Sequence, residues 1–201
     1  TLTKSQSPIF KKTLTAYSYL FEELIQSCED KYNELLEMYY CIKKGNFEQS
    51  RLHHLVDEIF ISLDKDIIDI LILDDLSFKN QLYSNALDKM KRTVKNEIKA
   101  PFNRRDLQDN LITGFTSGTY MYFRDVYNDI HLSRNLSLSK EYRVANFYFI
   151  REYCYGSMFR YNSKGEFNIP YGGMSYNRKD FKAKITEIFC QETQKILSTT
   201  E

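Results

Sequence analysis

Four hydrogen-bonding side chains stand at short intervals among aromatic residues in the stretch MFRYNSKGEFNIPYG, residues 158–172. They are Arg160, Asn162, Lys164 and Asn168. Arginine can bond bidentately to the edge of guanine, and asparagine can do so to adenine. Polar and apolar residues alternate on both sides of Asn162–Gly165, where glycine can supply the positive φ of a tight turn. We therefore expect a β-hairpin over 158–172, which would be thin enough to enter the major groove of DNA.

A purely structural interpretation of this stretch is also open. The same alternation is typical of an aromatic-rich core hairpin whose charged residues only solvate its rim. The residues by themselves do not separate the two interpretations.

Two stretches carry an excess of positive charge. The stretch from Lys89 to Arg105 contains seven basic residues and one acidic residue. The stretch from Arg143 to Lys184 contains eight basic residues and three acidic residues. The formal net charge of the whole chain is only +1, so any polyanion-binding face must be a local patch. The candidate phosphate contacts are Lys91, Arg92, Lys95, Arg104, Arg105, Arg178 and Lys179. A solvated helix face is the alternative for the first stretch.

No catalytic, cofactor or metal motif is visible in the sequence. His53 and His54 are adjacent, so on a helix they point in different directions, and His131 stands alone. The four cysteines have no C-x-x-C spacing, which favours buried free thiols. The G-x-G-x-x-G and Walker spacings do not occur. We predict no catalytic residue, no cofactor-binding residue and no metal site in this chain.

Helical periodicity dominates the rest of the sequence. Apolar residues recur at three and four over 15–42, which predicts an amphipathic helix, most simply a pair, that stops at Gly45. A second helix should follow from Gln49. The run IIDILIL at 67–73 fits a buried strand or a helix end, and we favour the helix. Ser and Thr residues in the GFTSGT segment, 114–119, are expected to cap a further helix.

The longest strongly apolar run, 67–73, is interrupted by Asp69 and is far shorter than the roughly 20 residues that cross a bilayer. The N-terminal segment lacks the apolar region of a signal peptide. We predict no membrane association and a cytoplasmic location.

The stretch 142–180 resembles the target-recognition region of the Dam-type family of adenine-specific DNA methyltransferases. In that family a helix ends in an aromatic residue and leads into the pattern Arg-x-Asn-x-x-Gly-x-Phe-Asn-Val-Pro-Tyr-Gly. Here the pattern stands as Arg160, Asn162, Gly165, Phe167, Asn168, Ile169, Pro170, Tyr171 and Gly172. The segment YFRDVYN at 122–128 is also similar to the family.

The resemblance implies roles for single residues. Arg160 would contact a guanine of a GATC-like site, and Tyr155 would intercalate while the target adenine is flipped out. Met158 and Pro170 would make apolar contacts with bases. The DNA-binding set is then Tyr155, Met158, Arg160, Asn162, Lys164, Asn168, Pro170 and Tyr171. The sequence departs from the family at Gly156, where Asn is frequent, and at Ser157, where Gly is usual.

The family's cofactor loop and its catalytic Asp-Pro-Pro-Tyr are both absent from the sequence. The resemblance implies that the chain is a fragment of a larger Rossmann-like enzyme. The parent would transfer a methyl group from S-adenosylmethionine to the amino group of an adenine in double-stranded DNA, in a setting such as restriction-modification. The portion with the catalytic motifs would be its partner, and this chain alone would be inactive.

The expected fold class is mainly α with a small β-hairpin. We expect a helical region of unknown role at 1–110 and a target-recognition region at 111–201, with a helix at 139–155 and the hairpin at 158–172. A different class stays open: a non-catalytic helical DNA-binding or assembly protein that retains the hairpin. A helical interaction domain with a purely structural hairpin is a third possibility.

Overall fold

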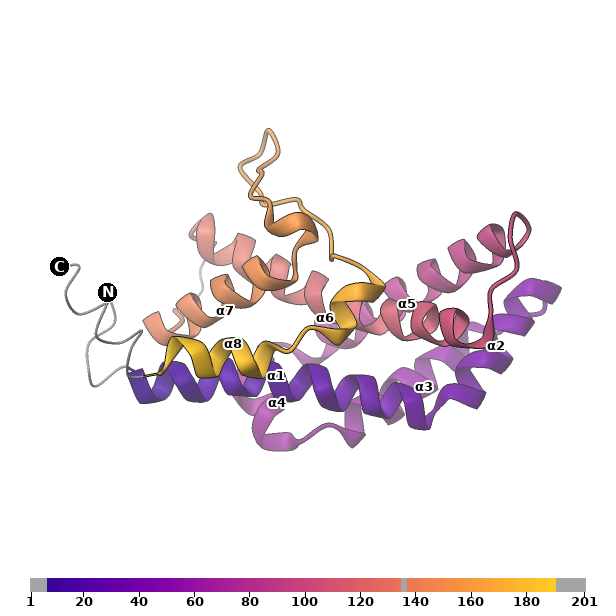
Figure 1. Cartoon of the computed structure of the whole chain (residues 1–201), viewed down its shortest axis with the longest axis horizontal. Coiled ribbons are helices and arrows are strands. Elements are labelled where there is room, and N and C mark those ends of the chain that lie inside the picture. The colour runs from indigo at the N-terminus through magenta and orange to yellow at the C-terminus, as the bar shows by residue number, and fades with distance from the viewer. Residues whose placement is uncertain (1–6, 135–136, 191–201) are drawn as a thin grey trace.

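The computed structural model describes residues 7–134 and 137–190, which form eight α-helices and two short 3-10 turns (Figure 1). The helices are α1 (Ser7–Asp30), α2 (Tyr32–Lys44), α3 (Gln49–Ser62), α4 (Lys65–Leu71), α5 (Asp75–Glu97), α6 (Arg104–His131), α7 (Lys140–Tyr153) and α8 (Phe181–Ile188). The 3-10 turns are η1 (Tyr155–Ser157) and η2 (Met174–Arg178).

The first four helices follow their sequence signals. The expected pair over 15–42 is α1 and α2, and α2 ends at Gly45, whose φ of 76° is left-handed. The helix expected from Gln49 is α3. The ambiguous run 67–73 lies largely in α4, which begins after Asp64. The side chain of Asp64 caps this helix by accepting from the backbone N–H groups of Asp66 and Ile67.

Helices α5 and α6 form the most extensive contact between helices of the described residues, and two glycines let them approach closely. A Cβ at Gly118 would lie 2.6 Å from the carbonyl oxygen of Gln81, and one at Gly114 would lie 2.7 Å from the Cα of Ala86. The GxxxG spacing of α6 is therefore a helix-packing feature. The caps expected in 114–119 were wrong: α6 begins earlier, after Asn103, whose side chain accepts from the N–H of Asp106 at 2.8 Å.

An aromatic cluster joins the two ends of the chain. Tyr17 of α1 lies 4.7 Å, between ring centroids, from both Phe123 of α6 and Phe149 of α7. Phe181 of α8 packs on Phe149 at 6.2 Å. The buried hydroxyl of Tyr17 accepts from the amide of Asn146 at 3.2 Å. Burial of these large rings in one continuous core fixes α6 and α7 on α1.

The β-hairpin expected over 158–172 was wrong. The described residues contain no strand or sheet, and so they form no Rossmann-like α/β unit. Two isolated antiparallel bridges, Cys154 to Tyr171 and Tyr161 to Phe167, close an irregular loop instead. We call residues 154–172 the projecting loop, because it rises above the helices in Figure 1. Side chains of α6 bond to backbone groups of the return segment that point away from the opposite arm of the loop, as described below.

The helix expected at 139–155 corresponds to α7. The boundary expected between residues 110 and 111 falls inside α6, and the division into two regions stays a prediction. Among the residues described, every helix is too short or too polar to cross a bilayer.

Candidate nucleic-acid interface

The projecting loop turns at 162–166 around the side chain of Asn162. Its Oδ1 accepts from the backbone N–H groups of Lys164 at 2.9 Å and Glu166 at 3.0 Å. Gly165 follows with a φ of 77°, a conformation that costs other residues more. The carboxylate of Glu166 accepts from Asn162 at 3.0 Å and from Arg134 at 2.9 Å, and both bonds hold its pKa below the usual range. Asn162 therefore shapes the turn from within.

Two side chains of α6 hold the loop through three hydrogen bonds to its backbone. Asn128 donates to the carbonyl oxygen of Phe167 at 3.1 Å and accepts from its N–H at 2.7 Å. Tyr120 donates to the carbonyl oxygen of Ile169 at 3.0 Å. These backbone groups are buried, so they need such partners. The bonds across the loop are made by neighbouring residues instead, from the N–H of Asn162 to the carbonyl oxygen of Glu166 at 2.8 Å and from the N–H of Asn168 to that of Arg160 at 3.2 Å.

Aromatic residues support the tip of the loop on one side. The hydroxyls of Tyr127 and Tyr161 share a hydrogen bond of 2.9 Å, and His131 stacks on Tyr161 at 5.0 Å between centroids. Burial is the main cause that raises the pKa of Tyr127, and the hydrogen bond with Tyr161 adds to it, so the hydroxyl of Tyr127 keeps its proton. These contacts fix the direction in which the loop projects beside the last turns of α6.

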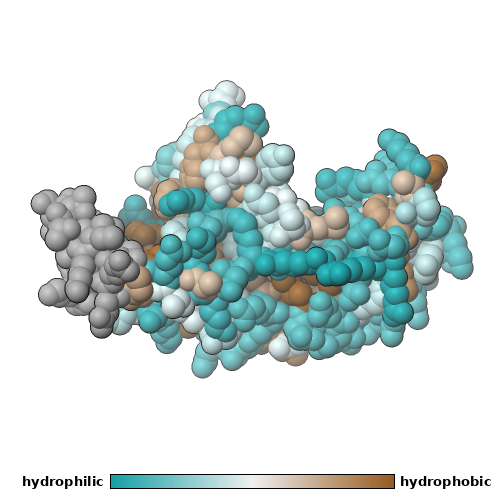
Figure 2. Space-filling view, viewed as in Figure 1, coloured by the Kyte–Doolittle hydropathy of each residue, from teal (hydrophilic) through white to brown (hydrophobic). Residues whose placement is uncertain are grey.

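The face that the loop presents outward contains most of the predicted DNA contacts. Tyr155 is 56% exposed and Met158 is 49% exposed, and Arg160, Lys164 and Pro170 are exposed as well. In Figure 2 apolar side chains gather on this projection, with hydrophilic ones beside them. Exposed aromatic rings and apolar side chains on one loop can stack on nucleobases, and exposed basic side chains can bond to nucleobase edges.

Arg160 keeps most of its bonding capacity. Its Nε donates to Oδ1 of Asn168 at 3.4 Å, and its two terminal nitrogens have no partner within the described residues. The Asn168 contact limits the rotation of the guanidinium group. A held guanidinium with two free nitrogens suits bidentate bonding to a base edge or a phosphate.

The predicted contact Tyr171 lies elsewhere. It is 7% exposed, and its hydroxyl donates to Oδ1 of Asn177 in η2 at 2.7 Å. Asn177 also accepts from Thr116 at 2.8 Å and donates to Thr113 at 3.0 Å, both on α6. The side chain of Tyr171 therefore connects the base of the loop to α6.

Tyr155 stands out from the surface because of the backbone that follows it. Gly156 and Ser157 have φ values of 63° and 50°, two consecutive left-handed residues. The N–H of Gly156 donates to the hydroxyl of Tyr176 at 3.0 Å. The ring of Tyr155 is left without a stacking partner in the described residues, as an intercalating ring would need to be.

The predicted phosphate contacts separate into two groups. Arg178 bonds to Asp109, and Lys179 bonds to the carbonyl oxygen of Glu152 and lies over the ring of Tyr176, 4.0 Å from its centroid. The other group is exposed at the α5–α6 connection: Lys91, Arg92, Lys95, Arg104 and Arg105. Hydrophilic side chains cover this end of the molecule in Figure 2.

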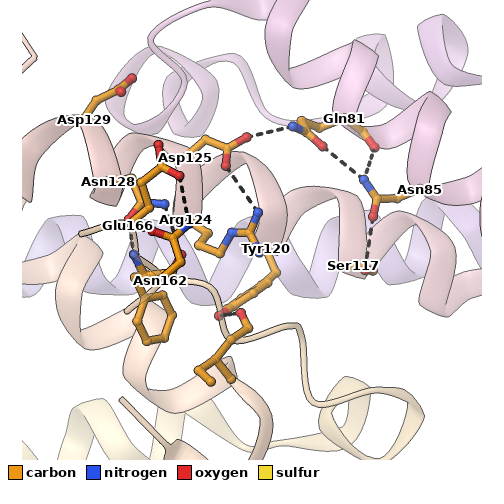
Figure 3. Close-up of polar contacts among 12 residues, drawn as sticks. Gln81, Asn85, Ser117, Tyr120, Arg124, Asp125, Asn128, Asp129, Asn162 and Glu166 are labelled. Carbon is orange, nitrogen blue, oxygen red and sulfur yellow. Dashed lines mark hydrogen bonds and ion pairs between the residues drawn. The ribbon is translucent and has the colours of Figure 1, made fainter. Parts of the chain in front are cut away.

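A polar chain crosses from α5 to α6 behind the loop (Figure 3). Gln81 donates to Asp125 at 2.8 Å and receives a bond from Asn85 at 3.0 Å. Burial raises the pKa of Asp125, and Arg124, with a terminal nitrogen 3.6 Å away, opposes this shift. The Nε of Arg124 is buried without a partner. These residues fix the register of α5 against α6, the helix that holds the loop.

Asn128, Tyr120 and Asn177 were not among the site residues predicted from the sequence. A weak signal existed for Asn128, because it directly follows Tyr127 on the apolar stripe of α6, where a buried amide must find partners. No group of three potential metal ligands occurs in residues 7–134 and 137–190.

Comparison with known proteins places this geometry in context. Residues 58–200 match the family described as D12 class N6 adenine-specific DNA methyltransferase. The type II methyltransferase M.MjaIII of Methanocaldococcus jannaschii is 28% identical over 105 residues, which are 50% of this chain and 36% of that protein. A DNA adenine methylase of Vibrio cholerae is 32% identical over 72 residues, 36% of this chain and 25% of that protein. The chain thus spans about a third or less of these relatives' length. No solved structure matches.

Proposed function

This chain belongs to the family of D12 class N6 adenine-specific DNA methyltransferases, and from that premise we propose that it is the DNA-recognition portion of such an enzyme. The supporting observation is the projecting loop. Its backbone is bonded to α6 through Asn128 and Tyr120, while Tyr155 and Arg160 are exposed. A fixed backbone with free outward side chains is the arrangement that base recognition requires.

In this proposal the loop enters the major groove of double-stranded DNA. Arg160 bonds to O6 and N7 of a guanine, and Asn168 keeps the guanidinium in place. Met158 and Pro170 contact bases through apolar atoms, and Lys164 at the turn contacts a phosphate or a base edge. The ring of Tyr155 enters the base stack and favours the extrusion of the target adenine.

The parent enzyme would methylate the N6 amino group of that adenine, in a restriction-modification setting or another one. S-adenosylmethionine, when bound, supplies the methyl group. The sequence has no glycine-rich loop of the G-x-G-x-x-G type and no Asp-Pro-Pro-Tyr, so we assign none of its residues to the cofactor or to methyl transfer. This chain orients and opens the duplex.

Selection from a randomised duplex pool, with a salt titration, tests the proposal. The protein should enrich a short motif that contains G and A. Arg160→Ala should lose the preference for one guanine, a loss of about 1–3 kcal/mol in discrimination. Arg143→Ala is the matched control, because Arg143 is an exposed arginine on α7 outside the loop, and it should keep the motif.

An unchanged base preference in Arg160→Ala would contradict the assignment of Arg160. Enrichment without any methylation by the longer protein would favour a non-catalytic DNA-binding protein. Absence of binding to every duplex at low salt would favour a structural loop in an interaction domain.

A further inference from the structure

A second surface on this molecule has the chemistry of a phosphate-binding site. We define the basic tip as Lys91, Lys95, Lys99 and Arg105, at the end of the molecule where α5 connects to α6. All four side chains are exposed, and none has a side-chain partner within the described residues. Elsewhere on the surface, basic residues such as Lys31 and Lys79 are paired with carboxylates at 2.9 and 2.8 Å.

The acid nearest in sequence does not neutralise the basic tip. Glu97 accepts from the ammonium of Lys43 at 2.7 Å and from the hydroxyl of Tyr39 at 2.6 Å. Asp106 accepts from the neutral amide of Asn103 at 2.8 Å and keeps its negative charge beside Arg105, so this carboxylate offsets one of the four positive charges of the tip. The positive charge of the tip is therefore directed to solvent, where anionic phosphates would be attracted.

The basic tip and the projecting loop are connected by one helix. Arg105 lies in the first turn of α6, and Asn128, which holds the loop, lies near its last turn. At 1.5 Å per residue, the two positions are about 35 Å apart along the helix axis. In Figure 1 the loop and the α5–α6 connection rise on the same side of the molecule, and in Figure 2 the surface between them is hollowed.

This spacing is close to one turn of B-DNA, about 34–36 Å. A DNA backbone returns to the same face of the duplex after each turn. We propose that the basic tip binds phosphates of the same duplex about one helical turn to one side of the bases that the loop reads. The inference rests on the proposed function, because it takes DNA as the ligand. It adds that the footprint is asymmetric and extends beyond the recognition site.

Duplexes with unequal flanks test this inference. The enriched site is placed in one duplex with about 15 base pairs on one side and about 3 on the other, and in a second duplex with about 3 base pairs on both sides, a comparison that also holds for a palindromic site. The protein should bind one arrangement at least about tenfold tighter, since several phosphate contacts are available in only one of them. In Lys91→Gln/Lys95→Gln/Arg105→Gln the two arrangements should bind alike, with the base preference intact.

The control is Lys12→Gln/Arg51→Gln/Lys65→Gln, which removes the same formal charge from exposed positions on α1, α3 and α4, where Arg51 and Lys65 are paired with Glu37 and Asp69 at 3.0 and 2.6 Å. It should retain the difference between the two arrangements. Equal binding of both arrangements by the unmodified protein would overturn the inference, as would a difference that survives in the tip variant.

A second arm separates failure of the inference from failure of the proposed function. On a random duplex of about 30 base pairs, the tip variant should lower the slope of log affinity against log salt by about 3, and Arg160→Ala by at most about 1. A normal slope in the tip variant would overturn the inference even if the loop reads sequence. A changed slope together with an unchanged base preference in Arg160→Ala would overturn only the role of the loop.

Discussion

Asn128 gives Phe167 the two hydrogen bonds that a neighbouring strand would otherwise provide, one to its N–H and one to its carbonyl oxygen. A single side chain on α6 therefore replaces a rung of β-ladder at the centre of the projecting loop.

Removal of this side chain should loosen the loop. Asn128→Ala leaves two buried backbone groups without partners, so the free energy of unfolding should fall by about 3 kcal/mol. Urea unfolding measures the loss, and hydrogen exchange at the amide of Phe167 locates it. Asn46→Ala, at an exposed residue between α2 and α3, should change stability by less than about 0.5 kcal/mol. Unchanged exchange at Phe167 would be evidence against this role.

Helix spacing should be sensitive to one methyl group at Gly118. Its Cβ would meet backbone atoms of α5, the carbonyl oxygen of Gln81 at 2.6 Å and the Cα of Leu82 at 2.8 Å. Because backbone cannot rotate away, Gly118→Ala should cost about 1–3 kcal/mol in thermal or urea unfolding. Ser84→Ala on the exposed side of α5 is the control. Equal stability of the two variants would mean that α5 and α6 are less closely packed.

The backbone after Tyr155 should respond to glycine in opposite ways at two serines. Ser157 has a φ of 50°, so Ser157→Gly relieves a strained conformation and should raise the free energy of unfolding by about 0.5 kcal/mol. Ser163 has no positive φ, and Ser163→Gly should lower it by about 0.5 kcal/mol through chain entropy. Chemical denaturation of both variants checks the signs. A loss of stability in Ser157→Gly would contradict the strain.

The turn of the loop should weaken in acid. Asn162 and Arg134 lower the pKa of Glu166 in the folded protein, so its stabilising contribution is fully present above the pKa of the unfolded chain. It is lost as pH falls through the lower, folded pKa. Glu166→Gln should therefore be less stable than the unmodified protein by a constant amount from pH 7 to about 5, and the gap should close below that. A gap that widened in acid would reverse the sign.

Local sequence patterns predicted most of the helices, because the signals for helix formation and termination lie within a few residues of one another. The 3.6-residue period and Gly45 were sufficient for α1 and α2. The start of α6 was missed because Thr116 and Thr119 bond to carbonyl oxygens of their own helix, and so residues that look like caps lie inside it. From the sequence alone, a serine or threonine that caps a helix looks the same as one that donates to a carbonyl oxygen within the helix.

Distant contacts account for what the sequence could not predict. In the alternation over 159–169, Phe167 and Ile169 of the return segment are buried, whereas Phe159 and Tyr161 of the outgoing segment are exposed like Arg160. The alternation could not indicate that the partners of the backbone are Asn128 and Tyr120, which lie 39 and 49 residues away in the chain. A period of two reports which side is buried, and it does not report whether a strand or a helix covers that side.

The bonds that Asn128 and Tyr120 of α6 make to the loop end on backbone atoms, the N–H and carbonyl of Phe167 and the carbonyl of Ile169. Backbone atoms are the same whatever side chain a residue carries. The identities of Met158 and Arg160 can therefore change during evolution, or in a designed library, without loss of these anchors. The outward side chains of the loop can therefore be exchanged to reach new target sequences while the helices that hold its backbone stay unchanged.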